Sequence, residues 1–122
     1  MATNLTTQNL AQFSGSECLY VSLLMPLKYT EGVKFLIDNG ASRVVQLVAM
    51  VSTLFKEHDR QFWKLVKSDI VGADLVLEDG DGKEINRVHE ESLIFCDSLL
   101  EGLEGGLSIW VMDGVMLLPG EY

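Results

Sequence analysis

The stretch LVLEDGDGKEIN, residues 75–86, fits either a calcium loop between helices or the turn of a β-hairpin. An EF-hand loop needs oxygen ligands at its first, third and fifth positions, glycine at the sixth and a bidentate glutamate at the twelfth. Placing Gly82 sixth puts Leu77 first and Val88 last. The register that uses Gly80 fails at the same two positions. We therefore interpret the stretch as a hairpin.

Charge pairing predicts the register of this hairpin, since opposite charges on facing positions stabilise a strand pair and like charges destabilise it. Turns at Asp79-Gly80 or Asp81-Gly82 oppose two acids in each case. A turn centred on Gly80-Asp81 opposes none. That turn pairs Glu78 with Lys83, Val76 with Ile85 and Asp74 with Arg87.

The sequence before this hairpin has helical periodicity. Thr30 is expected to cap a short helix that Asn39-Gly40 ends, and Ser42 to cap a longer second helix. The second helix carries an apolar stripe at the spacing of a core-facing helix, formed by Val44, Leu47, Val48, Val51, Leu54 and Phe55. An extended segment is expected at 17–25, and one turn of helix in the N-terminal LAQF.

From about residue 60 the pattern becomes that of strands, at 61–67, 73–78, 83–88, 92–96, 107–112 and 115–119. Helices followed by strands indicate an α+β fold, with two N-terminal helices packed on an antiparallel sheet built mainly from the second half. The chain has 122 residues, 48% of them hydrophobic, which is the size of a single domain, residues 1–122, with a core of its own.

A second hairpin is predicted at the C-terminus around Asp113-Gly114, with four facing pairs: Met112 with Val115, Val111 with Met116, Trp110 with Leu117, and Ile109 with Leu118. Both of its faces are apolar. We therefore expect it to be central and covered on both sides, or to join subunits. The candidate oligomer interface is Ile109, Trp110, Val111, Met112, Val115, Met116 and Leu117.

The net charge of −9 lies entirely in the second half, because residues 1–60 carry five basic and five acidic side chains. Such acidity disfavours nucleic acid and anionic membranes as direct partners and favours a basic protein partner. The alternative is that the charge only confers solubility. The candidate partner surface comprises Asp74, Glu78, Asp79, Asp81, Glu84, Glu90 and Glu91.

The sequence contains no motif typical of a catalytic, cofactor-binding or metal site. The cysteines Cys18 and Cys96 and the histidines His58 and His89 lack the close pairing typical of zinc sites, and no phosphate-binding or nucleophile motif occurs. We expect no enzyme activity, cofactor or metal, and free thiols in a reducing cytoplasm. There is no signal-peptide pattern, and the longest apolar run, 43–55, is shorter than the roughly 20 residues that cross a bilayer.

Four segments carry a family resemblance: LAQFSGSE at 10–17, LKYTEGVKFL at 27–36, FWKLV at 62–66 and GVMLLPGEY at 114–122. In order and spacing they resemble a small uncharacterised domain family of bacteria, phages and plasmids that ends in Leu-Leu-Pro-x-Glu-Tyr. The resemblance implies no catalytic residues. It implies an accessory protein carried on mobile elements.

These observations lead to one hypothesis of function and two alternatives. The first is a non-enzymatic interaction protein that binds a basic protein through its acidic sheet surface. One alternative is a structural homo-oligomer joined through the C-terminal hairpin. The other is a phage-type inhibitor of a nucleic-acid-binding host complex.

Overall fold

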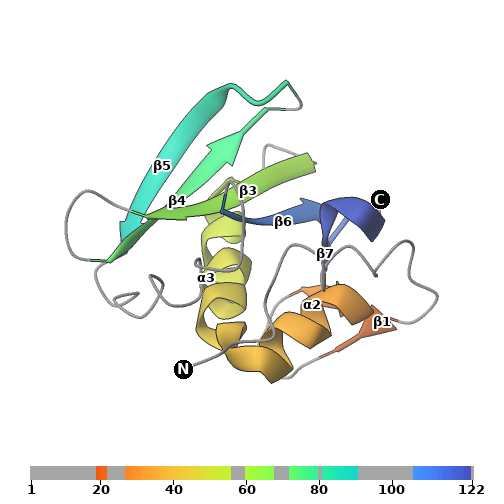
Figure 1. The fold of residues 1–122 in the computed structure, drawn as a ribbon. Coiled ribbons are helices and arrows are strands. Elements are labelled where there is room, and N and C mark those ends of the chain that lie inside the picture. Colours follow the sequence, from red (N-terminus) through yellow and green to blue (C-terminus); the bar gives the residue numbers. More distant parts are fainter. Residues whose placement is uncertain are drawn as a thin grey trace.

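The protein, analysed as a computed structural model, is an α+β domain in which helices cover one face of a sheet (Figure 1). The structure describes residues 19–21, 27–55, 60–67, 72–79, 81–90 and 106–121. The strands in these ranges are β1 (Leu19–Tyr20), β2 (Lys28–Thr30), β3 (Arg60–Lys67), β4 (Ala73–Glu78), β5 (Glu84–Glu90), β6 (Leu107–Met112) and β7 (Val115–Leu117).

The strands form one sheet in the order β1-β2-β7-β6-β3-β4-β5. All neighbours are antiparallel except β2 and β7, which run parallel. The predicted α+β class, with a sheet mainly from the second half, is therefore confirmed, and the parallel pair is an addition to it. The predicted strand at 92–96 and helical turn in LAQF lie outside the described residues.

The helical layer runs from Glu31 to Phe55 without an intervening loop, so the predicted pair of separate helices is not matched. It consists of α2 (Glu31–Leu36), a π-helical turn (Ile37–Ala41), α3 (Ser42–Ser52) and a 3-10 turn (Thr53–Phe55). Asn39 and Gly40, which has φ of 99°, have non-helical backbone angles and form a kink between α2 and α3. The Asn39 amide donates to the Phe35 carbonyl at 2.8 Å and so bridges the bend.

One of the two predicted helix caps is present. The Thr30 hydroxyl accepts from the Val33 amide at 3.5 Å, as expected for the N-cap of α2. Ser42 does not cap α3, because the helix already runs through it from the bend and the cap position, Ala41, has no side-chain hydrogen bond. No helix within the described ranges is long and apolar enough to cross a membrane.

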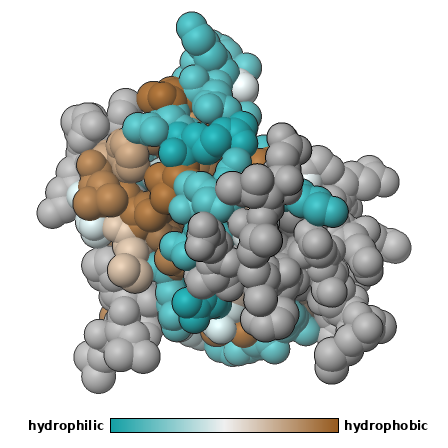
Figure 2. All heavy atoms as spheres, turned by 90° about the vertical axis from the view of Figure 1, so that its left-hand side faces the viewer, coloured by the Kyte–Doolittle hydropathy of each residue, from teal (hydrophilic) through white to brown (hydrophobic). Residues whose placement is uncertain are grey.

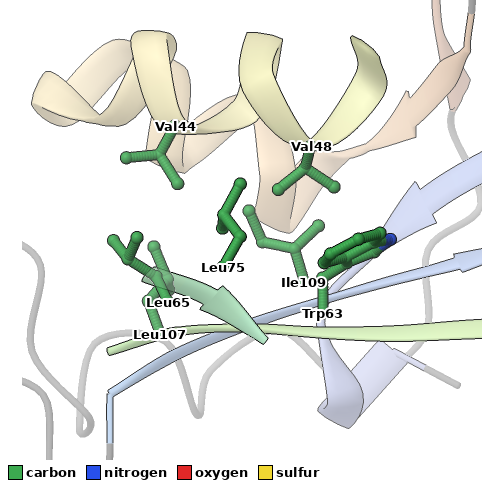
Figure 3. A pocket seen from close by; sticks show the side chains of 7 residues that line it. All are labelled: Val44, Val48, Trp63, Leu65, Leu75, Leu107 and Ile109. Carbon is green, nitrogen blue, oxygen red and sulfur yellow. The ribbon is translucent and has the colours of Figure 1, made fainter. Parts of the chain in front are cut away.

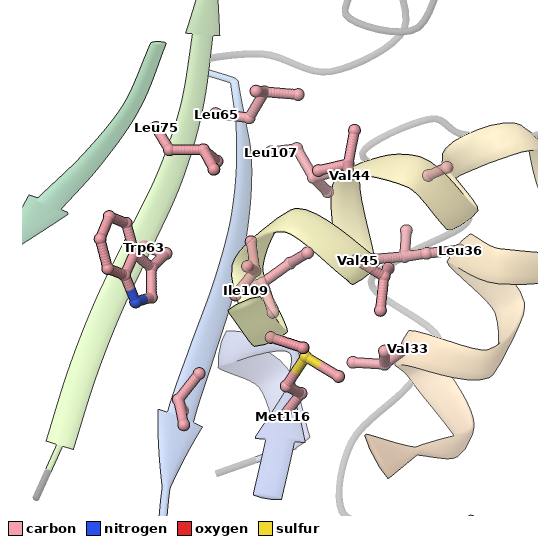
Figure 4. Packing of buried hydrophobic residues seen from close by; sticks show 14 of the residues in the cluster. Val33, Leu36, Val44, Val45, Trp63, Leu65, Leu75, Leu107, Ile109 and Met116 are labelled. Carbon is pink, nitrogen blue, oxygen red and sulfur yellow. The ribbon is translucent and has the colours of Figure 1, made fainter. Parts of the chain in front are cut away.

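The core lies between α3 and the centre of the sheet (Figure 4). Val44 and Val48 of the predicted stripe are buried, but Leu54 is 72% exposed, because the 3-10 turn rotates it away from the sheet. Val45 and Ala49 are fully buried in addition. At this interface the side chains shown in Figure 3 leave no room for a water molecule. This part of the interior is therefore packed core and not a ligand cavity.

The C-terminal hairpin has the predicted turn and register. Asp113 and Gly114 have φ of 52° and 78°, and positive φ at both turn residues is what a type I′ turn requires. Three predicted pairs form, Met112 with Val115, Val111 with Met116 and Trp110 with Leu117. The fourth does not, because β7 ends at Leu117. As predicted, β6 and β7 are central in the sheet.

The β4–β5 hairpin exists, but its predicted register is wrong. Asp74 faces His89, Val76 faces Arg87, and a β-bulge before the turn sets Glu78 against Glu84. The shift from the predicted register is two residues along most of the ladder. A shift of two keeps Arg87 and His89 on the face that the prediction gave them, but the bulge turns Glu84 to this face as well, opposite to its predicted one.

Candidate functional site

The turn of the β4–β5 hairpin is built around the carboxylate of Asp79. Its Oδ1 accepts from the backbone amides of Asp81 and Lys83, each at 2.9 Å. The Asp79 amide in turn donates to the Lys83 carbonyl at 2.8 Å. These backbone hydrogen bonds hold the pKa of Asp79 below its ordinary value. Asp79, a residue of the predicted partner surface, therefore stabilises the turn.

A chain of ion pairs crosses the hairpin on the face away from the helices. Arg87 Nη1 contacts Asp74 Oδ2 at 2.6 Å, and Arg87 Nη2 contacts Glu84 Oε1 at 2.8 Å. His89 Nδ1 lies 2.7 Å from Asp74 Oδ1. We name Asp74, Glu84, Arg87 and His89 the charged network. Asp74 contacts Arg87 diagonally across the two strands, so the predicted Asp74–Arg87 contact forms despite the changed register.

Contacts within the charged network shift the pKa values of Asp74, Glu84 and Arg87. Burial raises the pKa of Asp74, but hydrogen bonds with His89 and Arg87 outweigh it, and the net pKa lies below its ordinary value. The hydrogen bond from Arg87 likewise lowers the pKa of Glu84. The same contacts raise the pKa of Arg87. A carboxylate held charged by two partners is a structural anion and a poor general base.

The acids of the hairpin therefore divide into two groups. Asp74, Glu84 and Asp79 are engaged inside the hairpin, while Asp81 is exposed and Glu78 half-buried. Glu90 is half-buried, and Glu91 lies outside the described residues. The described hairpin residues still carry six acidic side chains against two basic ones, a net charge of −4. Figure 2 shows hydrophilic residues over the projecting end of the molecule.

Most of the candidate oligomer interface is buried within the chain itself. Ile109, Val111 and Met116 belong to the core under the helices. Met112 and Leu117, on the other face, are 9% and 8% exposed. Trp110 and Val115 are half-buried, and the Trp110 ring packs edge-on against Phe62 at 4.9 Å between centroids. Five of the seven side chains thus have little surface left for a second subunit.

A buried carboxylate at the other end of the sheet was missed in the sequence. Glu121 Oε1 accepts from the Thr30 hydroxyl at 2.6 Å and the Leu118 amide at 3.0 Å, and Oε2 accepts from the Gly32 amide at 3.1 Å. These bonds join the C-terminal 3-10 turn (Pro119–Glu121) to the start of α2. The only signal in the sequence was the Pro-x-Glu pattern, which indicated a family but no contact.

A pocket of about 330 Å³ lies beside this junction, lined by Thr30, Arg60, Met112, Asp113, Val115, Leu117 and Glu121. Its buried carboxylate is already hydrogen-bonded by three donors of the chain. Within the described ranges no three side chains of the metal-ligating types come together. Cys18, His58 and Cys96 lie outside these ranges.

The fold and the site define a small α+β domain with a charged, projecting hairpin. Its buried carboxylate, Glu121, is hydrogen-bonded within the chain. The chain belongs to DUF6876, a family of unknown function, whose model matches residues 4–122. This agrees with the resemblance to an uncharacterised small-domain family. Neither a curated protein nor a solved structure matches the chain.

Proposed function

We propose that the protein is a non-enzymatic interaction protein that binds a basic protein partner through its β4–β5 hairpin. The observation that carries the proposal is the hairpin's net charge of −4 at an outer edge of the sheet. Residues 84–87 are all exposed, so side chains on both faces of β5 reach solvent there. A projecting surface of one sign speeds the encounter with an oppositely charged partner.

The division of the hairpin's acids supports a recognition role for its tip. Arg87 neutralises part of the negative charge of Asp74 and Glu84 in the charged network. The surplus of negative charge in the hairpin therefore lies near Glu78 and Asp81. The carboxylate of Asp79 holds the backbone amides of Asp81 and Lys83 in the turn. A rigid tip loses less conformational entropy on binding than a mobile loop.

A binding titration with labelled peptides tests the proposal. A lysine-rich peptide should bind more tightly than its glutamate-rich counterpart, and its affinity should fall as ionic strength rises, because salt screens exposed charges. Glu78→Gln combined with Asp81→Asn should weaken binding several-fold. Asp113→Asn is the matched control, since it removes an exposed acid from the other hairpin and Asn tolerates positive φ. Equal binding of both peptides refutes the proposal.

A role on mobile elements gives the proposal a biological setting in the cytoplasm. There, an acidic hairpin that covers the nucleic-acid-binding surface of a host protein would act as a phage-type inhibitor. Displacement of duplex DNA from a basic DNA-binding protein, with salt held constant, would support this version. The alternative of a homo-oligomer joined through the C-terminal hairpin has less support, because most of its side chains are already buried in one chain.

A further inference from the structure

The outer edge of β5 has one backbone amide covered by a side chain of the same strand. β5 is the last strand of the sheet, and within the described ranges it pairs with β4 alone (Figure 1). The Arg87 amide donates to Asn86 Oδ1 at 2.8 Å. An amide bonded in this way points away from β4. Along an antiparallel strand the direction alternates, so Arg87 and His89 direct their N–H and C=O groups to the outer edge.

Edge strands pair readily with other strands, and proteins protect their outer edges with bulges and polar side chains. β5 carries both devices, since the bulge at the tip end of β5 interrupts its ladder and Asn86 covers the Arg87 amide. Asn86 is exposed, so a partner strand can displace its side chain without opening the core. The hydrogen bond between the Arg87 amide and Asn86 can therefore be replaced by one to a partner strand.

We propose that the β5 edge is the docking strand of the hairpin, to which an extended basic segment of a partner protein adds as a further strand, displacing Asn86 from the Arg87 amide. This inference rests on the proposed function and specifies its mode. Backbone hydrogen bonds to Arg87 and His89 would hold the segment. Its basic side chains would lie towards the acidic tip at Glu78 and Asp81.

Charge also selects this occupant over a second copy of the chain. An antiparallel pair of β5 strands centred on Arg87 overlaps the whole strand. It sets Arg87 against its own copy and brings Glu84 opposite Glu90, and like charges on facing positions destabilise a strand pair. A segment with lysine or arginine at the tip end avoids both conflicts. Its β-branched residues can pack beside Ile85, which is 48% exposed, and the half-buried Val88.

The test uses a seven-residue peptide of alternating threonine and valine with two lysines at one end. Two further versions are N-methylated on one or the other alternate set of backbone amides, and a fourth carries glutamates instead of lysines. Each peptide is titrated against the wild type and against Asn86→Ala and Asn86→Val, which both remove the acceptor of the Arg87 amide. Valine favours strands, so it serves as the second variant if alanine destabilises the hairpin.

Asn86→Ala and Asn86→Val should tighten binding of the lysine peptide about three- to tenfold, because the peptide no longer competes with a hydrogen bond. One N-methylated version should lose this gain and bind at least about tenfold more weakly, and the other should not, because only one set of amides faces β5.

Equal binding of both methylated versions overturns edge docking while leaving the proposed function intact. No preference for lysine over glutamate overturns the proposed function, and the inference with it. Self-association of the Asn86 variants by light scattering, without tighter peptide binding, would replace the basic segment with a second copy of the chain.

Discussion

The junction between Glu121 and the start of α2 yields the sharpest stability prediction. Glu121→Ala removes the acceptor of three donors, the Thr30 hydroxyl and the Leu118 and Gly32 amides. Hydrogen bonds to charged groups contribute about 1.5–3 kcal/mol each, but burying the carboxylate also has a cost. We expect a net loss of about 2–4 kcal/mol in the free energy of unfolding.

Gly32 provides an internal check on that number. A Cβ at this position would lie 2.4 Å from Glu121 Oε1 and 2.7 Å from Leu118 Cδ1. Gly32→Ala should therefore destabilise the wild type, although alanine intrinsically favours a helix by up to about 1 kcal/mol. In the Glu121→Ala background the closest clash is gone but the contact with Leu118 Cδ1 at 2.7 Å remains, so the same change should cost less than it does in the wild type. The coupling between the two substitutions should be about 1–3 kcal/mol.

Urea unfolding followed by circular dichroism of all four proteins measures this cycle, with a shared slope against urea as the check on two-state behaviour. The reasoning is refuted if Gly32→Ala costs the same in both backgrounds. It is equally refuted if Glu121→Ala changes stability by less than about 0.5 kcal/mol, the effect of an ordinary surface substitution.

Three further predictions follow from the rest of the structure. The pKa of Asp74 is lowered below its ordinary 3.8 in the fold, so its contribution to stability is present above pH 3.8 and is lost as pH falls from there through the folded-state pKa. In acid unfolding, the stability difference between wild type and Asp74→Asn should therefore be constant above pH 3.8 and narrow progressively below it. Val48→Ala should cost about 2 kcal/mol in urea unfolding, whereas Leu54→Gln should change stability by less than about 0.5 kcal/mol, since Val48 is fully buried and Leu54 is 72% exposed. Gly40→Ala should cost about 1–2 kcal/mol by the same measurement because of the positive φ of 99°, with no clash to add to it.

The parts of the fold that were predictable are those set by local sequence. The Asp113-Gly114 turn fixes both φ values and thereby the register of β6 and β7. The limits of β4 and β6 also match the predicted strands, 73–78 and 107–112, because apolar runs bounded by turn residues define them. Thr30 was predictable as the N-cap of α2 because a threonine directly before a helical pattern is also a local signal.

The parts that were missed depend on side-chain bonds that facing charges do not encode. The Asp79 carboxylate accepts hydrogen bonds from two backbone amides and so stabilises the turn. The β4–β5 register formed with this turn differs from the predicted one, although it places Glu78 opposite Glu84. Asn39-Gly40 was expected to end the first helix. The Asn39 side chain instead bridges the bend there by donating to the Phe35 carbonyl. The contact from Glu121 to Thr30 spans most of the chain, so no local pattern could indicate it.

The same distinction applies to the candidate partner surface. Sequence identified the acidic segment, but it could not separate Asp81, which is exposed, from Asp79 and Asp74, which bond within the hairpin. Nor could it show that Asn86, an uncharged residue outside the acidic set, covers the edge of β5. Recognition therefore depends on the direction of backbone groups as well as on charge.

Amide hydrogen exchange, measured residue by residue with and without the lysine peptide, tests the docking of a basic segment on the β5 edge most directly. Exchange at Arg87 and His89 should slow by roughly tenfold or more at saturation, because the His89 amide gains a partner on the strand that docks and the Arg87 amide exchanges the exposed Asn86 side chain for a backbone acceptor. Exchange at Gly114, in the turn of the other hairpin, should stay unchanged. Unaltered exchange at Arg87 and His89 in a saturated complex would contradict the account.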